Sequence, residues 1–359
     1  MNNELVLKHI FEQISTANTP IDDGLFTGRS GQIIFLYHLS EITKNKQAKQ
    51  LADTLLGEMY NSIKSKGKSS FPNFDNGLAG IGWCQEYLVN KNFCEGNTDD
   101  VLKDVDSIIF KILNEVEDIP FNLNGLIGYL IYCTSRLYNK KSVNITTKIN
   151  QELLIRIINK IDLVAPNLFL HIGKECSFDL FWSLPVLLLT LNKALDLNVH
   201  NEKIFVMIDQ WMYYLNTHLP GIHSHRLSLA LSLFHMNKKL NRKDVDKLIH
   251  LLLFSVDFDI FYKEVNPYVF NIQYGWYGIV LLLHHAKKIF NSEHPHYNML
   301  EQFRLKIIDI CKTSSEEEII SGFKTHYEKK LTINFGLANG LSGIGLLYLL
   351  YPEIGRAHV

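Results

Sequence analysis

The sequence predicts an all-α protein, and three observations lead to that class. Apolar residues recur at helical spacing along most of the chain, strand-like segments are weak, and one glycine frame is repeated before several long apolar runs. Together they predict an α/α toroid, a double ring of seven inner and seven outer helices. We expect it to form one domain that covers residues 1–359.

The repeated frame is a pair of glycines three residues apart, followed by a mostly apolar run. It occurs at Gly28–Gly31, Gly77–Gly80, Gly125–Gly128, Gly275–Gly278 and Gly340–Gly343. The first glycines are separated by 49, 48, 150 and 65 residues. Because 150 is close to three of the shorter intervals, we expect two further repeats without the glycines, starting near Ser183 and His225.

Each repeat also contains an amphipathic segment. In residues 99–116, for example, one helical stripe is formed by Val101, Val105, Ile108, Ile109, Ile112 and Leu113. A nearly all-apolar helix must be buried on most of its faces. Seven such helices, each paired with an amphipathic one, therefore predict an inner ring inside an outer ring. Glycine at the start of an inner helix allows close backbone approach.

Composition and charge exclude several functional classes. The chain has 36 basic and 37 acidic residues and no basic block, so we expect no nucleic-acid partner. Its longest apolar stretch is 12 residues and contains Pro185, whereas a membrane span needs about 20. With no signal-peptide layout at the N-terminus, we expect a cytoplasmic protein without a membrane span. The 5 scattered cysteines favour neither a disulfide framework nor a zinc knuckle.

The repeats "NGLAGIG" at 76–82 and "NGLSGIG" at 339–345, each before an apolar helix, resemble those of the lanthionine synthetase C-like family. This resemblance covers most of the chain, and it implies an α/α toroid. Typical members add a peptide cysteine thiol to dehydroalanine or dehydrobutyrine and so form the thioether rings of lanthipeptides. The partners implied are a precursor peptide and a dehydratase or other peptide-modifying enzyme.

The resemblance also implies where zinc would bind, and this sequence differs at those positions. Typical members hold zinc through a Trp-Cys-Tyr-Gly motif in the fifth repeat and a Cys-His-Gly motif in the sixth. Here the sixth repeat has Gln273 and Tyr274 in place of Cys and His, and "HSHRLSLA" in the fifth contains no Cys. Trp182 stands near the expected His of the fourth repeat, and Phe121 and Asn122 near the Asp of the third. We therefore expect neither a metal nor another cofactor.

Two functions fit these substitutions. The first is a zinc-independent thioether cyclase, an enzyme of the lyase class. Its expected catalytic residues are Tyr277, His223, His225 and Arg226, with Tyr277 or a histidine as proton donor. The expected substrate-binding residues are Gln273, Tyr274, Trp276, Trp182 and Asn124. The second function is a catalytically inactive scaffold that binds a precursor peptide or a partner modification enzyme, because aromatic residues replace or flank the ligand positions.

Two lesser alternatives concern acids and histidines. Acidic residues at the repeat starts could form the carboxylate pair of an α/α-toroid glycoside hydrolase, or they could cap helices. These residues are Asp22, Asp23, Asp75 and Asp179. His218, His223 and His225 could supply metal ligands, although a site needs three or four convergent groups.

Overall fold

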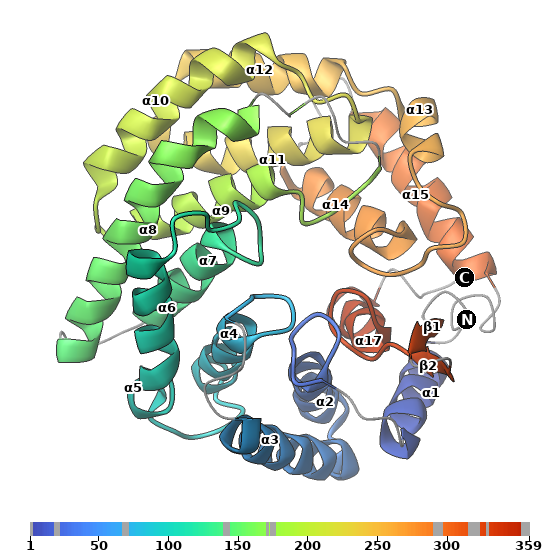
Figure 1. Ribbon diagram of the computed structural model, residues 1–359. Helices are drawn as coiled ribbons and strands as arrows, with labels where there is room; N and C mark the ends of the chain where they lie inside the picture. The colour runs from blue at the N-terminus through green and yellow to red at the C-terminus, as the bar shows by residue number, and fades with distance from the viewer. Residues whose placement is uncertain are drawn as a thin grey trace. The chain divides into compact units, whose positions relative to one another are not determined.

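The computed structural model describes residues 3–17, 22–66, 72–138, 144–169, 172, 177–289, 297–314, 324–327 and 330–352. Within these ranges the regular structure is helical apart from one two-stranded hairpin, so the predicted all-α class is confirmed (Figure 1). The chain divides into two compact units. The first contains Met1–Phe71, Asp75–Gly77 and Val265–Val359, and the second contains Pro72–Phe74 and Leu78–Glu264.

The first unit is built from both ends of the chain. Its elements are α1 (Asn3–Thr16), α2 (Arg29–Thr43), α3 (Lys46–Lys66), α14 (Trp276–Ile289), α15 (Tyr297–Thr313), β1 (Lys324–Tyr327), β2 (Lys330–Ile333) and α17 (Leu341–Leu350). Helix α2 packs against α3 and α17, α17 packs against α1, and α14 packs against α15. The N-terminal and C-terminal segments therefore share one core.

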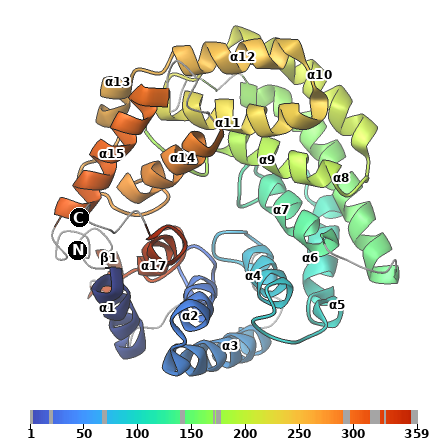
Figure 2. The same cartoon turned by 180° about the vertical axis from the view of Figure 1, so that it is seen from behind.

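The second unit has two layers of helices. Its elements are α4 (Leu78–Asn90), α5 (Thr98–Val101), α6 (Lys103–Glu115), α7 (Leu126–Leu137), α8 (Ile145–Phe169), α9 (Ser183–Leu195), α10 (Asn201–Thr217), α11 (His223–Leu240), α12 (Lys243–Phe254) and α13 (Phe258–Lys263). Helices α4, α7, α9 and α11 pack in succession, while α6, α8, α10 and α12 form the outer layer (Figures 1 and 2).

Burial follows the predicted division into apolar and amphipathic helices. Helix α2 is buried continuously from Ser30 to Leu39, whereas α6 buries a stripe that includes Val105, Ile109 and Leu113. The segment predicted as one helix over 99–116 is interrupted at Leu102, which is buried while Val101 is 47 % exposed. The stripe therefore starts one residue later than the periodicity predicts.

The sequence did not predict the hairpin. Strands β1 and β2 are antiparallel, with Lys324 opposite Ile333 and Tyr327 opposite Lys330. Both strands contain β-branched or aromatic residues, which favour extended structure. At four residues each, the strands are too short to give a clear alternating pattern in the sequence.

Five of the apolar helices, α2, α4, α7, α14 and α17, begin at the residue directly after the first glycine of a frame. In four of them, the first helical N–H donates a hydrogen bond to a carbonyl six or seven residues upstream. These bonds join Arg29 to Asp22 (2.9 Å), Leu126 to Pro120 (2.9 Å), Trp276 to Val269 (3.1 Å) and Leu341 to Asn334 (3.1 Å). The loop before each helix is thereby closed against the helix start.

Close packing explains why the frame contains glycine. A Cβ atom on Gly275 would lie 2.4 Å from the Val269 carbonyl oxygen, and one on Gly343 would lie 1.9 Å from the Leu337 carbonyl oxygen. Both distances are too short for any side chain, and neither neighbour is a flexible group. Glycine is therefore required at these two positions because neighbouring backbone atoms leave no room for a Cβ atom. An unusual backbone conformation is not the reason.

Backbone hydrogen bonds also connect the entrance loops of the first unit to one another. The Ile272 N–H donates to the Ala338 carbonyl at 3.0 Å, and the Leu337 N–H donates to the Leu25 carbonyl at 3.1 Å. The Phe26 N–H donates to the Asp75 carbonyl at 2.8 Å. Because these bonds run from loop to loop, they fix the starts of α14, α17 and α2 relative to one another.

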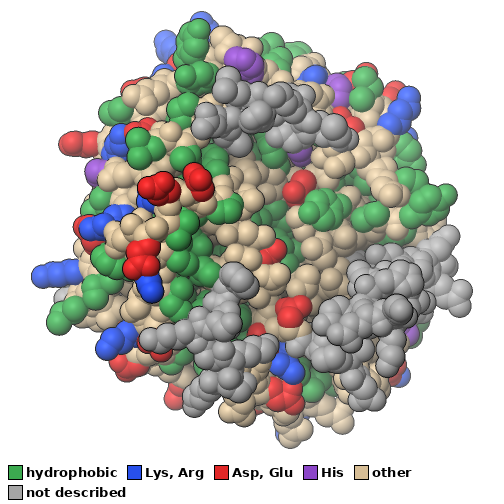
Figure 3. All heavy atoms as spheres, in the orientation of Figure 1, with side chains coloured by type: hydrophobic (Ala, Val, Ile, Leu, Met, Phe, Trp, Pro, Cys, Tyr) green, Lys and Arg blue, Asp and Glu red, His purple; other side chains and the backbone are tan. Residues whose placement is uncertain are grey.

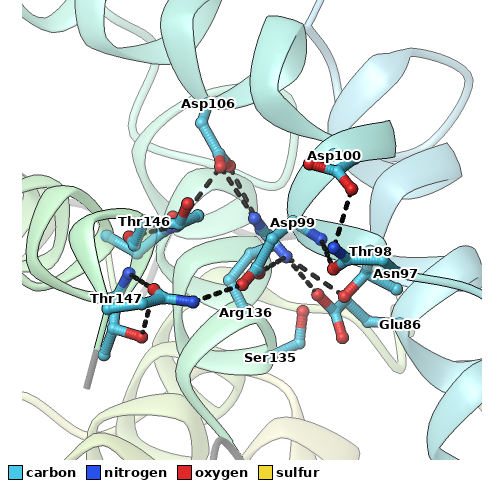
Figure 4. Close-up of polar contacts among 12 residues, drawn as sticks. Glu86, Asn97, Thr98, Asp99, Asp100, Asp106, Ser135, Arg136, Thr146 and Thr147 are labelled. Carbon is cyan, nitrogen blue, oxygen red and sulfur yellow. Dashed lines mark hydrogen bonds and ion pairs between the residues drawn. The ribbon is translucent and has the colours of Figure 1, made fainter. Parts of the chain in front are cut away.

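A buried arginine connects helices of the second unit. The Arg136 side chain on α7 is fully buried, and Figure 4 shows the carboxylates of Glu86, Asp99 and Asp106 turned toward it. Its Nη2 lies 2.9 Å from Asp106 Oδ2, and Tyr132 donates to Asp106 Oδ1 at 2.5 Å. The acids belong to α4, α5 and α6, so one guanidinium group holds four helices together. Burial opposes the charge, but these hydrogen bonds raise the pKa of Arg136 above its ordinary value.

We predict that Gly275→Ala lowers the free energy of unfolding by about 1–3 kcal/mol, because the new methyl group overlaps the Val269 carbonyl. Gly57→Ala is the matched control, since Gly57 lies inside α3 with no atom within 4 Å of its Cβ position. It should raise stability by about 0.5–1 kcal/mol. Urea denaturation measures the free energy of unfolding of both variants. If Gly275→Ala were as stable as the wild type, the close contact with the Val269 carbonyl would not be the reason for the glycine.

Arg136→Met should destabilise the protein by about 3–5 kcal/mol, because Glu86 and Asp106 would stay buried without their counter-ion. Arg156→Met serves as the control. Its side chain is 41 % exposed and pairs with Glu152 on the same helix, so the loss should stay below about 1 kcal/mol. Equal losses in the two variants, measured by chemical denaturation, would contradict the assigned role of Arg136.

Candidate functional site

The entrance of α14 carries two of the predicted binding residues. Gln273 is almost fully buried, and its Nε2 donates to Tyr274 Oη at 2.7 Å. Its Oε1 accepts a hydrogen bond of 2.9 Å from Asn339 Nδ2. Tyr274 is 44 % exposed. The structure thus brings Gln273 and Tyr274 together and joins them to the loop before α17.

This donor set does not fit zinc. Zinc in proteins is bound by thiolate, imidazole and carboxylate groups. At the two positions where the resemblance implies Cys and His, the side chains are a neutral amide and a neutral phenol that already bond to each other. Among the described residues, no three His, Cys, Asp or Glu side chains are grouped so that they could hold a metal ion.

Trp276 and Tyr277 are the first two residues of helix α14, and both side chains are buried. Trp276 Nε1 donates to the Pro267 carbonyl at 3.2 Å. Tyr277 is fully buried, and its hydroxyl lies 2.9 Å from the hydroxyl of Tyr348 on α17. Burial raises the pKa of Tyr277 well above its ordinary value, so the phenol stays neutral.

In the second unit, the structure brings Trp182 and His225 together. Their rings stack in parallel with centroids 4.4 Å apart, at the starts of α9 and α11. The Asp179 N–H donates to His225 Nε2 at 3.4 Å, which places the ring proton on Nδ1. That Nδ1 has no hydrogen-bond partner among the described residues. Burial lowers the pKa of His225 to about 4, so the imidazole is neutral at pH 7.

His223 and Arg226 also lie in the first turn of α11, where they bond to neighbouring backbone. His223 Nδ1 accepts a 2.8 Å hydrogen bond from the Asp257 N–H. Arg226 donates to the carbonyls of Pro220 at 2.8 Å and Ser255 at 2.6 Å. In these contacts, both side chains hold the helix start in place.

Glu264 replaces the missing glycine frame at the same helix start. Its carboxylate accepts hydrogen bonds from the N–H groups of His223 at 2.5 Å and Ser224 at 3.0 Å. A carboxylate there satisfies free helix N–H groups and favours the positive end of the helix dipole. Sequence reasoning missed Glu264 because it lies 41 residues after His223, the first residue of the helix that it caps.

The remaining candidate, Asn124, lies in the loop before α7, where its N–H donates to Asn122 Oδ1 at 2.8 Å. Asn339 was not among the predicted site residues. A signal for it exists, because Asn precedes the first frame glycine in three repeats, as Asn76, Asn124 and Asn339. The predicted residues fall into two groups. Gln273, Tyr274, Trp276 and Tyr277 belong to the first unit, and Trp182, His223, His225, Arg226 and Asn124 belong to the second.

The acids at the repeat starts have local structural partners. Asp22 accepts hydrogen bonds from the Gly24 N–H and Thr27, and Asp179 accepts one from the Phe181 N–H. Asp23 forms an ion pair of 2.7 Å with Arg29. These contacts support the helix-capping and turn interpretation of the acids over a glycosidase pair.

The distribution of charged side chains on the surface agrees with the nearly equal numbers of basic and acidic residues in the sequence. On the face drawn in Figure 3, basic and acidic side chains are interspersed with hydrophobic ones. Across the described residues, we found no helix with the length and apolar character that a membrane crossing requires.

The family model for the lanthionine synthetase C-like protein matches residues 19–168 and 200–357. No curated protein matches the chain. The interval between the two matched segments contains Trp182 and helix α9, where the glycine frame is absent.

We predict that His225 makes the stability of the protein depend on pH. Its native pKa of about 4 lies below the unfolded value of 6.5, so in this range the unfolded chain binds a proton that the native state does not. The free energy of unfolding should therefore fall by up to about 3 kcal/mol as the pH decreases from about 6.5 to about 4.

His225→Phe keeps a ring against Trp182 and should remove this part of the pH dependence. His250→Gln, which changes an exposed histidine of α12, is the control and should retain it. Denaturation at a series of pH values measures the slopes. A slope in His225→Phe that equals that of wild type would contradict the prediction.

Proposed function

Since the chain belongs to the lanthionine synthetase C-like family, we propose that it acts in modified-peptide biosynthesis as a peptide-binding member that does not catalyse zinc-dependent thioether formation. Its ligand would be a dehydrated, cysteine-containing precursor peptide. A dehydratase or another peptide-modifying enzyme would be its protein partner.

The observation that carries this proposal is the hydrogen-bonded group of Gln273, Tyr274 and Asn339. Zinc assists thioether formation by converting a thiol, whose pKa is about 8.5, into a thiolate at neutral pH. An amide and a phenol cannot bind a metal ion that would convert the thiol into a thiolate. The same side chains suit binding, because Tyr274 is partly exposed and an aromatic ring with a polar tip is a common recognition group.

The predicted proton-transfer residues support the same conclusion. Addition of a thiol to a dehydroamino acid leaves an enolate that must be protonated by a positioned acid. Tyr277 is buried against Tyr348, and its raised pKa makes it a weaker acid than an ordinary tyrosine. His223 accepts a backbone hydrogen bond, and Arg226 binds carbonyl groups.

A zinc-independent cyclase is the second candidate, and one observation favours it. The Nδ1 of His225 is a buried donor without a partner among the described residues. A neutral imidazole N–H can stabilise a developing enolate oxygen. Positioning of the two reacting groups could supply the remaining acceleration.

One experiment separates these functions. The purified protein is titrated calorimetrically with a dehydrated precursor peptide encoded beside its gene, and free thiols are counted over time with and without added zinc. We expect binding, with thiol loss at the rate of the peptide alone. Thiol loss above that rate, abolished by His225→Phe, would establish the cyclase instead, and absence of binding would reject the peptide-binding role.

Tyr274→Ala should weaken binding of this peptide by more than about five-fold, because it removes an exposed aromatic contact from the proposed site. Tyr138→Ala is a matched control, since Tyr138 has a similar exposed fraction of 48 % but lies at the C-terminal end of α7. Equal affinities for the two variants would place the peptide away from the entrance of α14.

A further inference from the structure

The loop before α14 carries a highly exposed aromatic side chain. We call residues 265–275 the α14 entrance loop; its exposed residues are Asn266, Pro267, Tyr268 and Tyr274. Tyr268 is 81 % exposed, more than any other large hydrophobic side chain that the structure describes. The core of the first unit therefore does not depend on the ring of Tyr268.

The backbone around Tyr268 is held in a fixed turn. The Tyr268 N–H donates to Asn266 Oδ1 at 3.0 Å, and the Val269 N–H donates to the Asn266 carbonyl at 3.1 Å. Pro267 fixes its own φ angle, and its carbonyl accepts a 3.2 Å hydrogen bond from Trp276 Nε1. An aromatic residue on a turn that is already ordered loses little conformational entropy when it binds a ligand.

Tyr268 and Tyr274 leave the α14 entrance loop from neighbouring points. The Trp276 N–H donates to the Val269 carbonyl at 3.1 Å, and the Cβ position of Gly275 lies 2.4 Å from the same carbonyl oxygen. Val269 directly follows Tyr268, and Gly275 directly follows Tyr274. One ligand segment can therefore reach both exposed tyrosines.

The loop before α17 continues this surface without adding charge. We call residues 334–340 the α17 entrance loop. The N–H groups of Ile272 and Gln273 both donate to the Ala338 carbonyl, at 3.0 Å and 3.2 Å, and Asn339 Nδ2 donates to Gln273 Oε1 at 2.9 Å. Neither entrance loop contains Asp, Glu, Lys, Arg or His. The two loops thus offer aromatic rings, amides and a phenol, but no formal charge.

The charged residues nearest to these loops in the sequence belong to other contacts or to the other unit. Lys263 and Glu264 precede the α14 entrance loop and belong to the second unit, where the Glu264 carboxylate accepts hydrogen bonds at the start of α11. In the loop before α2, Asp22 accepts hydrogen bonds from the Gly24 N–H and Thr27.

We propose that the α14 and α17 entrance loops recognise an uncharged segment of the precursor peptide, with Tyr268 and Tyr274 as its two aromatic contacts. This inference rests on the proposed peptide-binding function and adds the chemistry of the bound segment. A charged side chain in that segment would lose water without gaining a counter-ion. Uncharged residues, dehydrated ones among them, pack against aromatic rings without that cost.

Calorimetric titration of the full chain with the dehydrated precursor peptide tests the role of Tyr268. Tyr268→Ala should weaken binding by more than about five-fold, because it removes an exposed aromatic contact on an ordered turn. Tyr213→Ala is the matched control, since Tyr213 is 71 % exposed on the outer helix α10, and it should bind like wild type. If wild type binds and Tyr268→Ala binds equally well, this inference is wrong and the proposed function stands. If wild type does not bind, both fail.

Double-mutant cycles test the uncharged character of the segment. Tyr268→Ala is combined with alanine replacements along the peptide, and the affinities give a coupling factor for each position. Coupling of more than about three-fold should occur only at uncharged residues of the peptide. Lys263→Gln should bind like wild type. Strongest coupling at a charged residue of the peptide, or weaker binding by Lys263→Gln, would overturn the proposal.

Discussion

The apolar helices start where they do because a backbone carbonyl occupies the space in which a side chain would begin. At Gly275 this carbonyl belongs to Val269, which also accepts the first hydrogen bond of α14. The same arrangement recurs before α2, with the carbonyl of Asp22, and before α7, with the carbonyl of Pro120. The loop before each of these helices is therefore closed against the helix start.

The glycines determine where the helices start, whereas the residues beside them determine the chemistry of the candidate site. At seven frame glycines, Gly275 among them, an added Cβ atom would lie less than 3.0 Å from a neighbouring atom. The residues beside the glycines are not restricted in this way. Gln273, Tyr274 and Asn339 use that freedom to form a neutral hydrogen-bonded group. At α11, where the frame is missing, the carboxylate of Glu264 performs the same structural task from a distant part of the chain. A repeat can thus lose the glycines and still start its helix at a defined residue.

The sequence contained enough information for the helical class and for the start of five helices, because both follow from local patterns. It could not reveal contacts between distant segments. Arg136 looks like an ordinary charged residue at a helix end, and only the structure shows three acids from three other helices around it. The stacking of Trp182 on His225 also depends on the packing of α9 against α11. Gln273 and Tyr274 could be singled out because they lie beside the glycine frame. The hydrogen-bond partner of Gln273, Asn339, is 66 residues away in the sequence.

The hydrogen bond from Leu337 to Leu25 has a consequence for synthesis of the protein. Helix α2 is buried along most of its length, and α17, one of the helices that cover it, is the last helix described in the chain. A ribosome that adds roughly 5–20 residues per second needs about fifteen seconds to a minute to progress from Leu25 to Leu337. During that time α2 can pack against α3 but not against α17, and the apolar surface that α17 covers is open to aggregation or to chaperones. Completion of the first unit therefore has to wait until α17 has been synthesised, however early its first helices emerge.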